Sequence, residues 1–176
     1  MAREIRFTSA KPGGDRVHLV SEADVRVLLG RLPVEVYERL RAVHFNDRSW
    51  PLRHLGYVTA GRYEVALCAL PPRVSLSRYL ARPLSPTEFG ARRGAQWPRL
   101  AVRRFMLYDT FLHELGHLHV VDPKAHSPRR QFADERLASE FAVTWRRRLW
   151  AEPFDHPDPV HNKPSSDELE QVAVSR

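Results

Sequence analysis

The sequence predicts a single α+β domain in which a small, mainly antiparallel sheet packs against two successive helices. Three observations lead to this fold class. Strand-like segments at residues 54–59 and 62–67 flank Ala60-Gly61, which is a hairpin signal. Apolar residues then recur at helical spacing from Phe105 to Leu118. A second helical pattern follows over residues 128–142, and 176 residues suit one domain with a sizeable core.

The N-terminal part supplies the other predicted elements. Residues 3–8 and 16–20 are expected to form short strands around the turn at 11–14. A helix is expected to begin at Ser21, and helical spacing of apolar residues resumes after Pro33. The strand over 63–70 ends at Pro71-Pro72, and 82–98, rich in Pro, Gly and Arg, is expected to form a long loop or short helix able to cover a cleft as a lid.

The most specific motif is His113-Glu114-Leu115-Gly116-His117, an H-E-x-x-H pattern. A spacing of four residues places both imidazoles on one helical face, where they can bind one Zn²⁺. The intervening Glu114 can then reach a zinc-activated water. A pattern this short also arises by chance, most often on solvated helices.

The flanking residues favour a real metal site over a chance match. The helix is apolar on the side that should face the core, and two histidines and a glutamate are costly to bury there unless a metal compensates them. Gly116 weakens the helix by roughly 1 kcal/mol relative to Ala. Its presence therefore predicts a close approach by another part of the chain.

The second helix offers a third ligand. We expect Ser127 to cap it and Pro128 to occupy its first position. Glu135 shares a face with the small residues Ala138 and Ala142, which would allow close contact with the first helix. We therefore predict zinc ligation by His113, His117 and Glu135. A solvent-exposed Glu135 is the alternative.

The motif followed by Glu135-x-x-Ala138-x-x-Phe141-Ala142 resembles the gluzincin metallopeptidases, and most closely the ImmA/IrrE-type family. The resemblance covers roughly residues 54–145. It implies a zincin-like fold with these three ligands, Glu114 as general base, and cleavage of a specific regulatory protein. It departs from many gluzincins at Ser139, where they carry an acid or Asn, and in the short loop between the helices.

SprT-like zincins, which act on DNA-bound proteins, are the second family considered. They take a third histidine as ligand, and His126 weakly resembles their third-ligand segment. That hypothesis predicts His126 at the metal in place of Glu135. His119 lies roughly 200° around the helix from His117, so we expect it to be a core or supporting histidine instead of a ligand.

These residues predict peptide hydrolysis. Zn²⁺ lowers the pKa of a bound water to about 7. Glu114 accepts the water's proton and passes it to the leaving amine. Asp109 and Ser139 are the local candidates for orienting the histidines. His126 and Tyr79 are the candidates for stabilising the oxyanion. By analogy with zincins, the strand at 63–70 is the candidate edge strand that would bind an extended peptide substrate, and a plain structural strand is the alternative.

Composition narrows the class and location of the protein. A hydrophobic content of 43% argues against wholesale disorder, and no apolar run is long enough to cross a membrane. The charged residues at 3–6 stand where a signal peptide needs an apolar stretch, so we expect a cytoplasmic protein. Cys68, the single cysteine, is expected to be a buried thiol.

The chain divides into a predicted metallopeptidase domain at 1–150 and a Pro-rich tail at 151–176. Six acids outnumber two bases in this tail, which we expect to be extended or loosely packed. An autoinhibitory tail is the alternative, in which His156 or His161 touches the metal.

The charge of the chain bears on its partners. Arg supplies 25 of the 28 basic residues, and the net charge is +7. Such a field attracts anions, nucleic acid among them. A basic nucleic-acid-binding or partner-binding protein with a non-catalytic zinc site is therefore the alternative to a protease that acts on a protein or peptide.

Overall fold

The computed structural model describes residues 4–47, 54–76, 84–120 and 128–174. Four strands form one sheet in the order β1-β2-β4-β3, with bounds β1 (Arg6–Ser9), β2 (Ala42–Asn46), β3 (Gly56–Thr59) and β4 (Glu64–Cys68). β1 and β2 are parallel, β2 and β4 are parallel, and only β3 and β4 are antiparallel. The α+β class is confirmed, but the prediction of a mainly antiparallel sheet is wrong.

The mixed sheet follows from its connections. Between β1 and β2 the chain runs through α1 (Glu22–Gly30) and α2 (Val34–Tyr37), and such a crossover returns the chain parallel to its start. The predicted hairpin joins β3 to β4, with a short 3-10 turn at Ala60–Arg62. The predicted strand at 16–20 is reduced to a single bridge between Val17 and Leu70.

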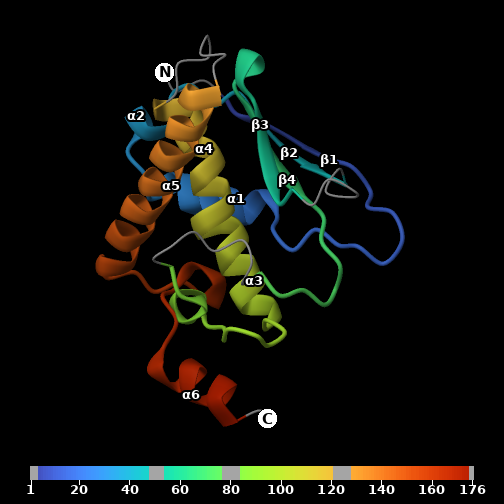
Figure 1. Cartoon of the computed structure of the whole chain (residues 1–176), viewed down its shortest axis with the longest axis vertical. Helices are drawn as coiled ribbons and strands as arrows, with labels where there is room; N and C mark the ends of the chain where they lie inside the picture. The colour runs from blue at the N-terminus through green and yellow to red at the C-terminus, as the bar shows by residue number, and fades with distance from the viewer. Residues whose placement is uncertain (1–3, 48–53, 77–83, 121–127, 175–176) are drawn as a thin grey trace.

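Two helical units lie against one side of the sheet (Figure 1). The first is one unbroken helical rod, made of α3 (Arg99–Phe105), a π-helical segment (Met106–Phe111) and α4 (Leu112–Val120). The second is α5 (Pro128–Ala151), which begins at the proline that the sequence predicts. Alternate residues of β2 and β4 are buried in the shared core: Val43, Phe45, Val65 and Leu67.

Helices α4 and α5 touch at Gly116. A methyl group placed on this glycine would lie 3.0 Å from Ala138 Cα and 3.2 Å from the Ala138 carbonyl oxygen. Such distances leave no room for a side chain, which confirms the close approach that Gly116 predicts. Ala138 is itself fully buried.

The segment predicted as a loop or lid is part of the core over much of its length. Pro86–Phe89 forms a short 3-10 helix, and the buried rings of Phe89 and Trp97 lie 6.1 Å apart. Of this segment, Leu84 lines the cleft described below.

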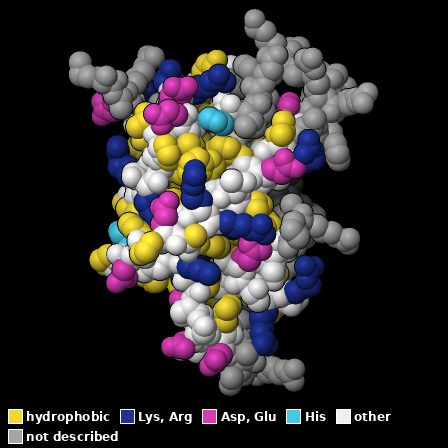
Figure 2. All heavy atoms as spheres, turned by 90° about the vertical axis from the view of Figure 1, so that its left-hand side faces the viewer, with side chains coloured by type: hydrophobic (Ala, Val, Ile, Leu, Met, Phe, Trp, Pro, Cys, Tyr) yellow, Lys and Arg dark blue, Asp and Glu magenta, His cyan; other side chains and the backbone are white. Residues whose placement is uncertain are grey.

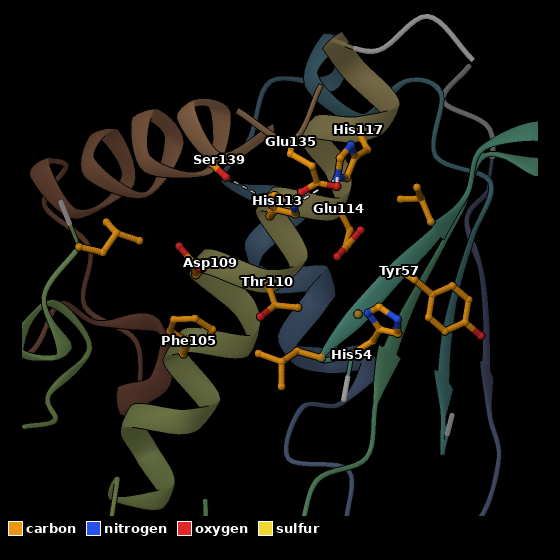
Figure 3. A pocket seen from close by; sticks show the side chains of 14 residues that line it. His54, Tyr57, Phe105, Asp109, Thr110, His113, Glu114, His117, Glu135 and Ser139 are labelled. Atoms are coloured by element: carbon orange, nitrogen blue, oxygen red, sulfur yellow. Dashed lines mark hydrogen bonds and ion pairs between the residues drawn. The ribbon is translucent and has the colours of Figure 1, made fainter. Parts of the chain in front are cut away.

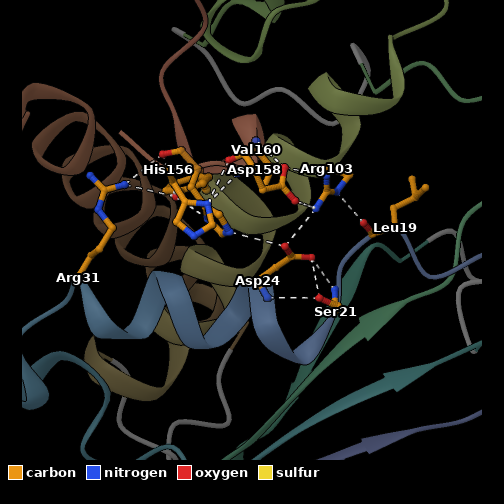
Figure 4. Close-up of polar contacts among 10 residues, drawn as sticks. Leu19, Ser21, Asp24, Arg31, Arg103, His156, Asp158 and Val160 are labelled. Atoms are coloured by element: carbon orange, nitrogen blue, oxygen red, sulfur yellow. Dashed lines mark hydrogen bonds and ion pairs between the residues drawn. The ribbon is translucent and has the colours of Figure 1, made fainter. Parts of the chain in front are cut away.

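The C-terminal residues are partly helical instead of extended, but most of their side chains are exposed, as the prediction of a loosely packed tail allows. They contain a 3-10 turn at Pro159–His161 and α6 (Ser166–Val174). Arg103 donates two hydrogen bonds to Asp158, at 3.1 and 2.7 Å, and also contacts Asp24 of α1 (Figure 4). Arg104, only 1% exposed, donates two hydrogen bonds to Glu168 at 2.6 and 3.1 Å. No helix in the described ranges is long and apolar enough to span a bilayer.

Candidate metal centre and cleft

The three predicted ligands converge. His113 and His117 lie one turn apart on α4, and Glu135 reaches them from α5 (Figure 3). The two Nε2 atoms are 3.1 Å apart, and the Glu135 carboxylate oxygens lie 3.2 Å from that of His113 and 3.3 Å from that of His117. In the part of the chain that the structure describes, this is the one group of three or more His, Cys, Asp or Glu side chains arranged to hold an ion.

The donor set fits zinc. Four ligand atoms about 2.05 Å from a tetrahedral metal lie about 3.3 Å from one another, which is the separation seen between these nitrogens and oxygens. The chemistry agrees as well, because imidazole nitrogens with one carboxylate are typical ligands of a catalytic zinc. A set of three protein ligands also leaves a fourth position open.

Glu114 is placed differently from Glu135. Its side chain is 9% exposed and points into the cleft beside the ligands (Figure 3). Burial raises the pKa of the Glu114 carboxyl, and the neighbouring His113 and His117 oppose that rise. By contrast, hydrogen bonds from the two histidines hold the pKa of Glu135 well below its usual range. Its surroundings thus favour the carboxylate form of Glu135, whereas burial favours the neutral form of Glu114.

Ser139 and Asp109, the predicted supports, have separate roles. The Ser139 hydroxyl lies 3.3 Å from His113 Nδ1, so a serine occupies the place of the expected acid and can fix the orientation of this ring. Asp109 instead accepts a hydrogen bond from Arg146 at 2.9 Å. Arg146 is fully buried and also binds Glu88 at 3.0 Å. Asp109 thus lines the cleft as the partner of Arg146, and among the hydrogen bonds of the described residues it has none to His113 or His117.

The ligands open onto a cleft of about 580 Å³. One wall is the rod from Phe105 to His117, and the other is residues 54–58, which include the start of β3 (Figure 3). The walls approach closely at Gly56, where an added methyl group would lie 3.0 Å from Thr110 Cγ2 and 3.2 Å from Glu114 Cγ.

The strand that forms one wall of the cleft is not the strand that the sequence predicts. By analogy with zincins, the strand at 63–70 is predicted to be the edge strand beside the helix that carries His113 and His117. In the structure β4 is internal, and β3 is the edge strand beside α4. His54, Gly56 and Thr110 are therefore missed by the sequence analysis. A glycine inside a strand pattern, as at Gly56, is the signal that points to such a close approach.

The predictions for the remaining histidines and for Cys68 are confirmed in some cases and wrong in others. His119 is exposed, and its ring is tilted by 40° against that of Phe141 with the centroids 5.3 Å apart, so the prediction of a core histidine is wrong. Burial raises the pKa of the Cys68 thiol to about 11, which confirms a buried, unreactive group. His156 and His161 line no part of the cleft. His126 and Tyr79 lie outside the described residues.

No protein-family model, curated protein or solved structure matches this chain.

Proposed function

We propose that the protein is a zinc metallopeptidase of the gluzincin type, with His113, His117 and Glu135 as the metal ligands. The observation that carries this proposal is the convergence of these three side chains beside a buried Glu114 that faces an open cleft. When bound, zinc would polarise the scissile carbonyl and acidify the attacking water.

The chain's own residues account for the proton transfers. Glu114, as a carboxylate, accepts a proton from the attacking water. Burial raises the pKa of this carboxyl, which improves its ability to hold that proton until it is donated to the leaving amine. Ser139 holds His113 in orientation, and the carboxylate of Glu135 stays ionised as a ligand must.

The cleft favours an extended peptide as the substrate. β3 is an edge strand, and a peptide laid beside it can pair with its unpaired backbone groups. This strand and Glu114 line the same cavity, so a peptide bound there would pass in front of the ligands.

A substrate bound to nucleic acid, as in the SprT-like alternative, gains less support. Three of the arginines, Arg103, Arg104 and Arg146, form ion pairs within the protein. On the face formed by α5 and α2, basic and acidic side chains are interspersed instead of forming one basic patch (Figure 2). We therefore propose a protein or peptide substrate, with regulatory cleavage of a specific protein as its role.

Metal analysis of purified variants tests the ligand set. Wild type should hold one zinc per chain, and Glu135→Ala should lose it. His126→Ala should retain it, as should Glu140→Ala, a matched control that removes an exposed acid from the same helix. Loss of zinc in His126→Ala but not in Glu135→Ala would favour the SprT-like alternative.

Hydrolysis of a quenched-fluorescence peptide mixture tests the reaction. Glu114→Gln keeps the size of the side chain but cannot accept a proton. It should keep zinc and lose at least about 100-fold in turnover. A variant that kept both zinc and full activity would leave a binding protein with a non-catalytic zinc as the better explanation.

A further inference from the structure

His54 stands on the opposite wall of the cleft from the metal ligands. It precedes β3, lines the same cavity as Glu114, His113 and His117, and is exposed (Figure 3). The strand pairing continues past the end of β3, because the Cys68 amide donates to the Leu55 carbonyl at 2.9 Å. The backbone at Leu55, next to His54, is therefore held against the sheet.

No structural role accounts for the His54 ring. Within the described part of the chain it takes part in no hydrogen bond, ion pair or ring contact, in contrast to His18, His44, His156 and His161, each of which has a partner. It does not belong to the ligand group, which is made by His113, His117 and Glu135. A polar ring thus faces the cleft with its hydrogen-bonding capacity unused.

The other side chains on this side of the cleft are poor donors to a substrate. The Tyr57 hydroxyl accepts a hydrogen bond from Asn46 at 2.6 Å, and its ring points away from Glu114 (Figure 3). Across the cleft, on the helical rod, Thr110 presents its methyl group to Gly56. Leu55 and Val58 are apolar. Among the described residues that line the cleft, His54 is the side chain best suited to donate a hydrogen bond from the strand side.

We propose that His54 is a catalytic residue of the proposed hydrolysis, and that its ring N–H donates a hydrogen bond to the oxygen of the scissile carbonyl. As the attacking water adds to the carbonyl carbon, the C=O π pair moves to this oxygen, which becomes an oxyanion that the donor stabilises. The water's proton goes to Glu114 and then to the leaving amine as the C–N bond breaks. His54 itself gains and loses no proton over the cycle.

The close approach at Gly56 makes this arrangement possible. Because Gly56 has no side chain, the strand comes close enough to the rod for Glu114 Cγ to lie 3.2 Å from where a Cβ would be. His54 lies two residues earlier, and its side chain lines the same cavity as Glu114 (Figure 3).

Turnover by zinc-loaded variants is the first test, and this arm rests on the proposed function. With the quenched-fluorescence peptide mixture, His54→Ala should lower kcat about 100-fold while KM changes little, because the hydrogen bond strengthens as the oxyanion forms. His54→Gln, which restores an N–H donor, should recover part of the loss. His18→Ala, a histidine outside this cleft, should match wild type. Zinc content and the unfolding temperature of all three variants should be unchanged.

Phosphate binding is the second test, and it needs no turnover. Inorganic phosphate is a tetrahedral anion, and its Kd for the zinc-loaded protein is measured by NMR titration of the histidine ring signals. His54→Ala should bind phosphate about tenfold more weakly, as expected for loss of one charge-assisted hydrogen bond. His18→Ala should bind it as wild type does.

The two arms separate the two proposals. A wild-type protein that cleaves no peptide would overturn the proposed function, and the phosphate arm would still decide the placement of His54. The role of His54 would be overturned if His54→Ala had a kcat or a phosphate Kd within twofold of wild type. This holds whatever the turnover of Glu114→Gln is.

Discussion

Replacing Gly116 with Ala tests the contact that brings the ligand helices together. The added methyl group would lie 3.0 Å from Ala138 Cα, 3.2 Å from the Ala138 carbonyl oxygen and 3.1 Å from Phe141 Cδ1. Two of these three atoms are backbone, so no rotation of a side chain relieves them. A comfortable contact is about 3.5–4.0 Å. α5 therefore has to move away from α4 by roughly 0.5 Å.

The expected effect on stability is small, and the effect on metal binding is large. Overpacking lowers the free energy of unfolding by about 1–3 kcal/mol, whereas the higher helix propensity of alanine raises it by about 1 kcal/mol. The net change is a destabilisation of about 1 kcal/mol, which lowers the unfolding temperature by about 2–4 °C. Glu135 lies one turn before Ala138, so it moves with α5. Because zinc–ligand distances tolerate only about 0.2 Å, zinc affinity should fall by about 10–100-fold.

Chelator-buffered zinc titration and thermal unfolding of the metal-free protein measure the two effects separately. Gly30→Ala is the matched control, since an added methyl group there meets nothing within 4 Å. It should leave zinc affinity unchanged and should not lower stability. A Gly116→Ala protein that bound zinc within twofold of wild type would refute the argument that this glycine sets the distance between the ligands.

Two further predictions concern the contacts of the C-terminal segment. Glu168→Gln removes the charge that neutralises the buried Arg104, and should destabilise the protein by about 2–3 kcal/mol in urea unfolding. Glu170→Gln, an exposed acid of the same helix, should have no effect, and equal stabilities of the two variants would contradict the ion pair between Glu168 and Arg104. Burial favours the neutral form of Asp24, but contacts with His161, Ser21 and Arg103 outweigh it and hold the pKa of Asp24 below its usual value. The ionised form thus stabilises the fold above about pH 4, and this stability is lost as pH falls further. Asp24→Asn should be less stable at pH 7, and its stability should fall less steeply than that of wild type between pH 4 and 2; parallel acid curves would contradict this.

The local part of the site could be predicted from the sequence because it depends on helix geometry. A spacing of four residues is enough to place His113 and His117 together. Gly116 indicates that something packs against α4, and Ala138 indicates which face of α5 can do so. Glu135 follows from the position of Ala138, because residues three apart share a helical face.

The opposite wall of the cleft could not be predicted in the same way. His54 and Glu114 are 60 positions apart, and no periodicity relates a strand to a helix across such a distance. The strand order depends on the crossover through α1 and α2, whereas apolar alternation along β4 is the same in an internal and an edge strand. The hairpin was predictable, but which of its strands formed the edge was not.

The tail shows why charge counts mislead when ion pairs are internal. A count of charges along the sequence assigns the acids of the tail to a solvated segment, and it assigns Arg103 and Arg104 to a basic surface. The structure pairs Asp158 with Arg103 and Glu168 with Arg104. Arg104 is only 1% exposed, and burying its charge without a partner would destabilise the fold. The acid of the tail therefore stabilises Arg104, and Arg104 in turn holds the tail in place. Both arginines lie in α3, which continues through the π-helical segment into α4. The C-terminal residues therefore contact the start of the helical rod that carries His113 and His117.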